Sequence, residues 1–349
     1  MARARKSPAS AEAGTTIMHR PARIEDAFHR WRERRGRRRG LVTTIVPYAG
    51  YGSTSWVRVL CRVVLTRGDA GEKQRAEKVR GWRSFFSIPV EDQPVTITAG
   101  GTEHRVIPNR GGIVDLRIEV ELEPGWQAIT LRTDDTEPVT APMFIVDPGT
   151  TFGIVSDVDD TVMVTALPRP FLAAWNTFVL DEHARTPVAG MSVLYERLIR
   201  SHPGSPVIYL STGAWNVAPT LTRFMERNLY PRGPLLLTDW GPTHDRWFRS
   251  GQEHKRGNLE RLAAEFPNIR WLLVGDDGQH DETIYGEFAT GHPDHVAAVA
   301  IRQLSTGEAV LAGGRKAAAH QQLSPVPWYF APDGAGLVGQ LSGAGLVAV

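Results

Sequence analysis

The distribution of apolar and polar residues divides the chain into two parts with different periods. Between about residues 41 and 148, apolar side chains recur at every second position, as at Leu116, Ile118, Val120 and Leu122, which alternate with charged residues. This alternation is typical of antiparallel strands with one buried and one solvated face. Clusters of Gly, Pro, Asn and Asp separate the runs. The pattern predicts a small antiparallel β-sandwich domain over residues 41–148.

From residue 152 the pattern changes to short runs in which every residue is apolar. Such runs are typical of strands buried on both faces of a parallel sheet, and helical patterns lie between them. We therefore expect an α/β domain over residues 149–312. The tail, residues 313–349, is rich in Gly and Ala and has no assignable pattern. The expected strands are 152–156, 207–210, 235–237, 271–274 and 296–301, and the expected helices lie near 189–201, 216–228, 254–266 and 280–289.

Residues 1–40 are predicted to be a basic, partly disordered region with a short helix. Ile24, Phe28, Trp31 and Arg35 recur at helical spacing within 21–39. The region holds 12 Lys/Arg and 4 Asp/Glu, a balance of +8, which leaves 28 basic and 34 acidic residues, a balance of −6, in the remainder. A basic arm on an acidic body favours an anionic partner: acidic lipid, nucleic acid or another protein. Two alternatives stay open: a solvated tail, and a helix that packs on the neighbouring β-sandwich domain.

Composition is that of a soluble globular protein. No stretch approaches the roughly 18 uncharged apolar residues of a membrane span, and the N-terminus lacks the apolar segment of a secretory signal. The single cysteine, Cys61, lies in an apolar run, which favours a small core residue over a reactive thiol. A cytoplasmic location is expected.

Carboxylates gather after two of the expected strands. Asp157, Asp159 and Asp160 follow the first, and Asp276 and Asp277 follow the fourth. In an open α/β sheet, the carboxyl ends of the strands form the ligand crevice, so these groups can meet there. Several carboxylates without a counter-ion repel one another, and a hard cation with oxygen ligands relieves the repulsion. The arrangement predicts a Mg²⁺ site. Asp160 and Asp277 are equally well explained as caps or solvated carboxylates.

The remaining polar positions suit a phosphate group. Ser211 follows the second strand, and its hydroxyl and the amides of Thr212 and Gly213 are expected where a helix begins, which favours anion binding. Lys255 is expected to open a later helix and to supply a positive charge to phosphoryl oxygens. The chain has no G-x-x-x-x-G-K-[ST] sequence, so a P-loop nucleotidase is excluded.

These motifs, in this order, resemble the haloacid dehalogenase superfamily, and more narrowly the catalytic domain of the actin-patch-protein phosphatidate phosphatase family, in its bacterial members. The resemblance covers about residues 148–302. Asp277 stands where that family usually has a serine, and Thr212-Gly213-Ala214 replaces a more usual Ser-Ser-Pro. The resemblance rests on the runs Ser156-Asp157-Val158-Asp159-Asp160-Thr161-Val162, Leu210-Ser211-Thr212-Gly213-Ala214-Trp215-Asn216, His254-Lys255 and Gly275-Asp276-Asp277-Gly278-Gln279-His280-Asp281.

The resemblance implies a Rossmannoid sheet with a minimal cap and assigns roles to single residues. Asp157 would be the nucleophile and a metal ligand. Asp159 would be the general acid and base, and its carbonyl would also bind the metal. Asp276 would complete the Mg²⁺ site. The phosphoryl group would be held by Thr161, Ser211, Thr212 and Lys255, and Lys255 would also take part in catalysis. Asp281 would orient Lys255 or a metal-bound water without contacting the substrate, and Asp277 would likewise lie just outside the residues that contact metal and substrate.

The implied reaction is hydrolysis of phosphatidate to diacylglycerol. The insertion Met163–Ala189 is too small for a closing lid domain, and an open site suits a large phosphorylated substrate such as a membrane lipid. Peripheral membrane association through residues 21–39 would follow, and nucleic acid is not expected as a partner. Two alternatives stay open: a phosphatase for soluble phosphomonoesters or phosphoproteins, and a non-catalytic adaptor that binds membranes or proteins.

Overall fold

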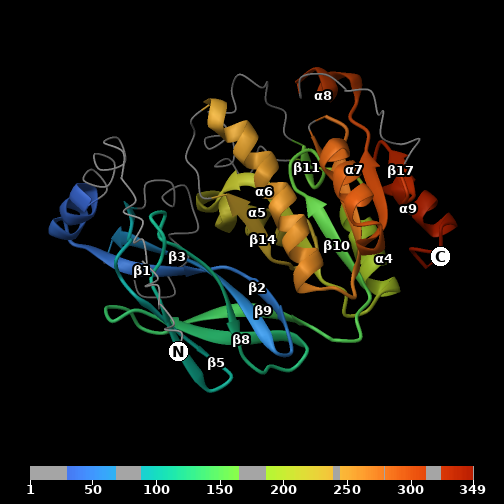
Figure 1. Cartoon of the computed structure of the whole chain (residues 1–349). Helices are drawn as coiled ribbons and strands as arrows, with labels where there is room; N and C mark the ends of the chain where they lie inside the picture. Colours follow the sequence, from blue (N-terminus) through green and yellow to red (C-terminus); the bar gives the residue numbers. More distant parts are fainter. Residues whose placement is uncertain are drawn as a thin grey trace, which may run out of the picture.

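A computed structural model describes residues 30–67, 88–164, 186–238, 244–278, 280–311 and 324–348. Two units follow one another along the chain, an all-β unit and an α/β unit, and they lie side by side (Figure 1). A helical segment, residues 30–38, precedes the first strand. No helix among the described residues has both the length and the hydropathy that crossing a membrane requires.

The first unit is one nine-stranded, mostly antiparallel sheet that folds around its own apolar core. Its long strand β3 pairs with β1, β2, β4 and β7, so both halves of the sheet meet along it. The predicted alternation is observed in β8 and β9. It does not hold along β3, which is buried on both faces over most of its length, or at Leu116, which is 37% exposed on β7; among the described strands, β7 pairs with β3 alone. The strands are β1 (Leu41–Pro47), β2 (Gly50–Ser53), β3 (Trp56–Arg67), β4 (Ile88–Pro89), β5 (Val95–Ala99), β6 (Thr102–Val106), β7 (Ile113–Glu119), β8 (Gly125–Arg132) and β9 (Val139–Val146).

The second unit is built on a six-stranded parallel sheet, which confirms the predicted α/β class. Its strands are β10 (Phe152–Asp157), β13 (Val207–Ala214), β14 (Leu235–Thr238), β15 (Arg270–Asp276), β16 (Val296–Arg302) and β17 (Trp328–Ala331). The other elements are β11 (Met163–Val164) paired with β12 (Thr186–Pro187), α4 (Met191–Ser201), η3 (Trp215–Val217), α5 (Ala218–Arg227), α6 (His244–Glu265), α7 (Asp281–Gly291), η4 (Pro293–His295), α8 (Thr306–Leu311) and α9 (Gly334–Gly343).

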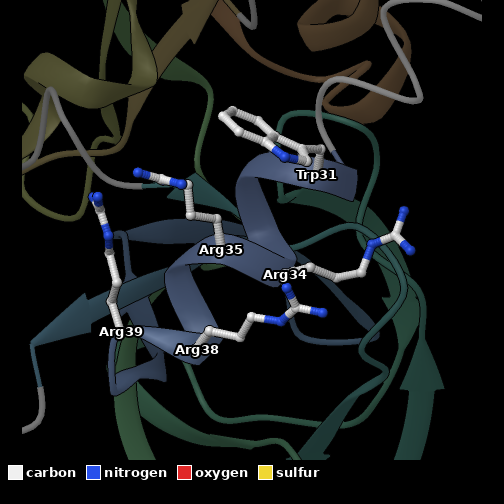
Figure 2. A pocket seen from close by; sticks show the side chains of 5 residues that line it. All are labelled: Trp31, Arg34, Arg35, Arg38 and Arg39. Atoms are coloured by element: carbon white, nitrogen blue, oxygen red, sulfur yellow. The ribbon is translucent and has the colours of Figure 1, made fainter.

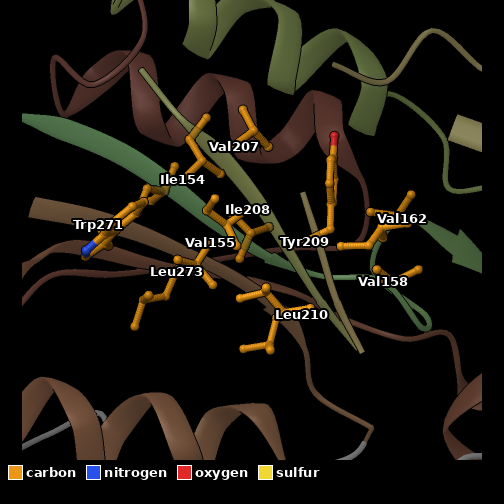
Figure 3. Packing of buried hydrophobic residues seen from close by; sticks show 14 of the residues in the cluster. Ile154, Val155, Val158, Val162, Val207, Ile208, Tyr209, Leu210, Trp271 and Leu273 are labelled. Carbon is orange, nitrogen blue, oxygen red and sulfur yellow. The ribbon is translucent and has the colours of Figure 1, made fainter. Parts of the chain in front are cut away.

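The order of strands in this sheet places a crevice at its centre. The order is β14-β13-β10-β15-β16-β17, so the chain winds outward from β10 in one direction and then continues from β15 in the other. In doubly wound sheets the ligand site lies at such a reversal, outside the carboxyl ends of the strands. Apolar side chains of β10, β13 and β15 fill the space between the sheet and its helices (Figure 3). The rigid core therefore fixes the ends of β10 and β15.

The segment after residue 313, which the sequence pattern left unassigned, contributes to this sheet. β17 pairs in parallel with β16, and α9 packs on α4 and β17. Asp333 caps α9, because its side chain accepts a hydrogen bond from the backbone amide of Gly336. The region that was expected to form a small cap, Met163–Ala189, lies for the most part outside the described residues.

The two units share an interface along β3. Trp56, Leu60 and Val64 of β3 belong to the apolar cluster of the α/β unit, whereas the odd-numbered positions between them face the core of the β unit. The ring of Tyr48 stacks on Trp215 with centroids 4.8 Å apart. The hydroxyl of Tyr51 donates to Glu265 of α6 at 2.8 Å. The β unit is thus joined to α6 and η3, two elements next to the crevice.

Candidate active site

Asp157 and Asp276 end the two central strands and lie at the reversal in strand order. β10 and β15 are paired in register through Ser156 and Val274, so their last residues come out side by side. Both carboxylates are buried, each 1% exposed. Ser156 supports this end of β10, because its hydroxyl donates to the carbonyl of Asp157 at 2.6 Å and contacts the hydroxyl of Tyr195 at 2.5 Å. The predicted meeting of carboxylates from two strands is observed.

Lys255 is the cation of this cluster. Its Nζ lies 2.6 Å from Oδ1 of Asp157 and 2.6 Å from Oδ1 of Asp281. Burial alone would lower the pKa of Lys255, but the two carboxylates outweigh burial and raise it. The expectation that Lys255 opens a helix was wrong. It lies in the middle of α6, which begins at His244, because the polar stretch before Lys255 continues the helix without an apolar period.

The turn after β10 has an unusual backbone conformation at Asp160, whose φ is 57°. The amide of Asp160 donates to the carbonyl of Met163 at 2.8 Å, and its carbonyl accepts a hydrogen bond from Arg302 at 2.8 Å. Asp160 is buried, so the alternative of a solvated carboxylate was wrong. The turn brings Asp159 and Thr161 back over the end of the strand. The Thr161 hydroxyl is buried and has no hydrogen-bond partner among the described residues.

Ser211 meets Asp159 from the neighbouring strand. Its hydroxyl donates to Oδ2 of Asp159 at 3.1 Å and accepts from the amide of Gly213 at 3.0 Å. The expected helix start at Thr212 and Gly213 was wrong. β13 continues to Ala214 because Ala214 pairs with Thr238 of β14, and the side chain of Thr238 donates to the carbonyls of Thr212 and Gly213. The turn of η3 begins only at Trp215.

A cation fits the carboxylate cluster. Oxygen atoms of Asp157, Asp276 and Asp281 lie within 4.8 Å of one another, and all three residues are buried. Oδ2 of Asp157 and Oδ2 of Asp276 have no hydrogen-bond partner among the described residues. Buried acceptors without partners are costly, and hard divalent cations take carboxylate ligands. The residues present therefore fit Mg²⁺.

The electrostatics of the cluster also favour a further positive charge. Burial raises the pKa of Asp276 well above its ordinary value, and the neighbouring carboxylates of Asp281, Asp157 and Asp160 raise it further. Burial likewise raises the pKa of Asp157, and the ammonium of Lys255 opposes that shift. Among the described residues, the ammonium of Lys255 does not by itself balance these buried carboxylates. A bound cation would hold them ionised.

Asp277 and Arg302 have structural roles beside the cluster. Oδ1 of Asp277 accepts a hydrogen bond from the amide of Leu304 at 2.8 Å, so its side chain ties the loop after β15 to the chain after β16. Arg302 is buried and donates to the carbonyl of Asp160 while its other nitrogen pairs with Glu308 at 2.6 Å. The sequence pattern did not identify Arg302, because an arginine at the end of an apolar run has no local signal.

Comparison with known proteins finds a match over the segment that contains this cluster. Residues 152–303 match the family described as phosphatidate phosphatase APP1, catalytic domain. The segment is therefore a catalytic domain of the phosphoric monoester hydrolase class, and the prediction of such an enzyme is confirmed. The match also supports the narrower phosphatidate phosphatase family.

Two curated relatives cover part of the chain. Phosphatidate phosphatase APP1 of Saccharomyces cerevisiae is 25% identical over 195 residues, 54% of this chain and 32% of that protein. An uncharacterized protein of Schizosaccharomyces pombe is 24% identical over 152 residues, 43% of this chain and 25% of that protein. The chain thus spans a third or less of the length of these relatives. A carbohydrate acetylesterase structure from Xanthomonas citri aligns over 78% of this chain and 73% of its own, with 9% identity and a TM-score of 0.29, which carries no argument about the fold.

Proposed function

We propose that the chain is a Mg²⁺-dependent phosphatase of the haloacid dehalogenase superfamily, a bacterial form of the phosphatidate phosphatase family, which hydrolyses phosphatidate to diacylglycerol and phosphate. One observation carries the proposal: Asp157 ends the central strand beside Asp276 and within 2.6 Å of Lys255. This cluster lies within the segment that matches a phosphatase catalytic domain. Mg²⁺, held by Asp157, Asp276 and the backbone of Asp159, would supply positive charge to the phosphoryl oxygens.

In the proposed reaction, a carboxylate oxygen of Asp157 attacks phosphorus while the bond from phosphorus to the glyceryl oxygen breaks. Asp159 protonates that oxygen, so diacylglycerol leaves and an aspartyl phosphate remains. Asp159 then takes a proton from water, which attacks phosphorus and releases phosphate and the free carboxylate of Asp157. The contact from Ser211 to Asp159 holds the acid over the strand end.

The residues around the nucleophile are proposed to position the phosphoryl group. Lys255 fixes the orientation of the Asp157 carboxylate and presents its charge to the incoming oxygens. The buried hydroxyl of Thr161 is available as a donor to a phosphoryl oxygen. Thr212 follows Ser211 on β13, and Asp281 accepts a hydrogen bond from the ammonium of Lys255.

The choice of phosphatidate rests on the family match and on the yeast relative's name. We further propose a cytoplasmic enzyme that reaches its substrate from the membrane surface. Soluble phosphomonoesters and phosphoproteins form the alternative substrate class. A non-catalytic adaptor is not supported, since the chain keeps the carboxylates and the lysine of the cluster and matches a catalytic domain.

A phosphate-release screen of the purified protein tests the proposal. With Mg²⁺, phosphatidate in mixed vesicles should be hydrolysed faster than glycerol 3-phosphate or para-nitrophenyl phosphate, and Asp276→Asn should remove most of the activity on all three. Preferential hydrolysis of the soluble monoesters would contradict phosphatidate as the substrate and favour the soluble substrate class. No phosphate release from any of the three with Mg²⁺ would contradict the phosphatase itself.

A further inference from the structure

The helix at residues 30–38 is held on the β unit by one of its faces. Gly36 is buried there: a Cβ atom at this position would lie 2.9 Å from Cδ1 of Ile88 and 3.0 Å from Cδ1 of Leu65. Arg37 of the same face donates to Glu33 at 3.0 Å and to Gln93 at 3.1 Å. The segment is therefore part of the folded β unit and presents its other face in a fixed orientation.

The opposite face carries five side chains that we call the arginine face: Trp31, Arg34, Arg35, Arg38 and Arg39. They recur three and four residues apart, so they share one side of the helix. They line a cleft of about 380 Å³. In Figure 2, which looks onto this face, Arg35 and Arg39 lie along one edge of it and Arg34 and Arg38 along the other, with Trp31 at the beginning of the helix. Trp31 is 52% exposed.

The described residues place no carboxylate in a salt bridge with the arginines of this face. Arg37, on the opposite face, forms salt bridges with Glu33 and Asp135. The guanidinium of Arg35 instead lies over the ring of Trp31, 5.5 Å from its centre. Four like charges within two helical turns repel one another, and an anionic surface that contacts all four removes that repulsion.

We propose that the arginine face docks on anionic phospholipid headgroups of a bilayer. The inference deepens the proposed function, on which it rests for the choice of lipid over nucleic acid. Guanidinium groups bind phosphate oxygens in a bidentate manner, and several of them can engage neighbouring headgroups. Tryptophan is enriched at the membrane–water interface, where its ring meets the apolar zone and its N–H stays solvated. The half-exposed Trp31 gives the arginine face an aromatic side chain suited to the membrane–water interface.

The proposal narrows the membrane contact that the sequence predicted for residues 21–39. That prediction combined attraction of the arginines to an anionic bilayer with burial of Ile24, Phe28 and Trp31, but Ile24 and Phe28 lie outside the described residues. Among the described residues, Arg35 lies on the same stripe as Trp31, and the arginines make up the rest of the face. The structure therefore supports electrostatic attraction, with Trp31 as one aromatic anchor, as the main contribution to membrane binding. This attraction should weaken steeply as the salt concentration rises.

Vesicle co-sedimentation with matched variants tests this inference. The triple variant Arg35→Gln, Arg38→Gln, Arg39→Gln removes three charges from the arginine face. The control, Arg105→Gln, Arg132→Gln, Arg200→Gln, removes the same number from arginines that are exposed in surface ion pairs elsewhere. Vesicles of phosphatidylcholine with phosphatidylserine carry surface charge but no substrate for the proposed reaction. Binding is therefore measured independently of phosphatase activity.

The triple variant should bind these vesicles roughly a hundredfold more weakly at low salt, since each arginine near an anionic surface contributes about fivefold. The control should bind within about threefold of the wild type, and both variants should hydrolyse para-nitrophenyl phosphate at the wild-type rate. Equal vesicle binding by the triple variant and the wild type would overturn the proposal, as would an equal loss in both variants. Loss of RNA binding with retained vesicle binding would also overturn it, because the face would then serve a nucleic acid. If the triple variant does not melt cooperatively, Arg38→Gln, Arg39→Gln takes its place, with an expected loss of roughly 25-fold.

Discussion

Lys255 of α6 joins Asp281 of α7 to the proposed nucleophile: its Nζ lies 2.6 Å from the carboxylates of both Asp281 and Asp157. Asp281 is fully buried and also lies close to the backbone of β15, whose Gly275 leaves room for it. The position of the lysine therefore depends on two helices and on Gly275, which does not contact the substrate in the proposed reaction.

Gly275→Ala should disturb this arrangement. A Cβ atom at Gly275 would lie 2.6 Å from Oδ2 of Asp281 and 2.8 Å from Cε2 of Tyr285, so Asp281 has to move. Overpacking of this kind costs roughly 1–3 kcal/mol. We expect a lower melting temperature and at least a tenfold lower kcat on a soluble phosphomonoester. Gly257→Ala is the control, because an added Cβ there meets nothing within 4 Å. An unchanged kcat in Gly275→Ala would show that Asp281 does not set the position of Lys255.

Arg302→Met should release the turn that contains Asp159 and Thr161. The buried guanidinium donates to the carbonyl of Asp160, whose φ of 57° is costly for a residue with a side chain. Without this support we expect kcat to fall at least tenfold and stability to fall by roughly 1–3 kcal/mol. Arg256→Met, which removes a surface ion pair with Glu287, is the matched control. A lower melting temperature with an unchanged kcat would limit Arg302 to a structural role.

The stability of the metal-free protein should depend on pH through Asp276. Its pKa in the folded state is raised well above the ordinary 3.8, first by burial and then by neighbouring carboxylates. The folded protein therefore keeps a proton that the unfolded chain releases, so this contribution to stability is complete below pH 3.8 and is lost as pH rises through the raised pKa. Mg²⁺ binds the ionised carboxylates and should act in the opposite direction.

Thermal melts at pH 5 and pH 8, in EDTA or in Mg²⁺, measure this dependence. Mg²⁺ should raise the melting temperature more at pH 8 than at pH 5, and Asp276→Asn should lose most of the difference. A Mg²⁺ effect of the same size at both pH values, or one that survives in Asp276→Asn, would count against the carboxylate site.

Much of the α/β unit could be predicted because strands buried on both faces appear in the sequence as runs of consecutive apolar residues. Strands β10, β13 and β15 are buried on both faces, so their apolar runs are uninterrupted and their ends locate Asp157 and Asp276. The sequences of β17 and α9 show no comparable apolar pattern. The helix is rich in Gly and Ala, and the strand, half-buried at the edge of the sheet, is only four residues long.

Features that depend on contacts between distant residues could not be predicted. Lys255 was placed at a helix start because α6 begins with polar residues that show no apolar period. The extension of β13 past Ser211 depends on pairing with Thr238, and the turn at Asp160 depends on Arg302, 142 residues away. The stacking of Tyr48 on Trp215 joins two units across 167 residues. None of these contacts has a sequence period that would indicate it.

The measurement that tests the central claim most directly is mass spectrometry of enzyme quenched in acid during turnover. Asp159→Asn should slow hydrolysis of the aspartyl phosphate, since general acid–base catalysis contributes roughly 10²–10⁴-fold. We therefore predict a phosphorylated peptide in this variant, with the phosphate on Asp157, and no phosphopeptide in the double variant Asp157→Asn, Asp159→Asn. Phosphate on another residue, or phosphate release that persists in Asp157→Asn, would contradict the assignment of Asp157 as the nucleophile.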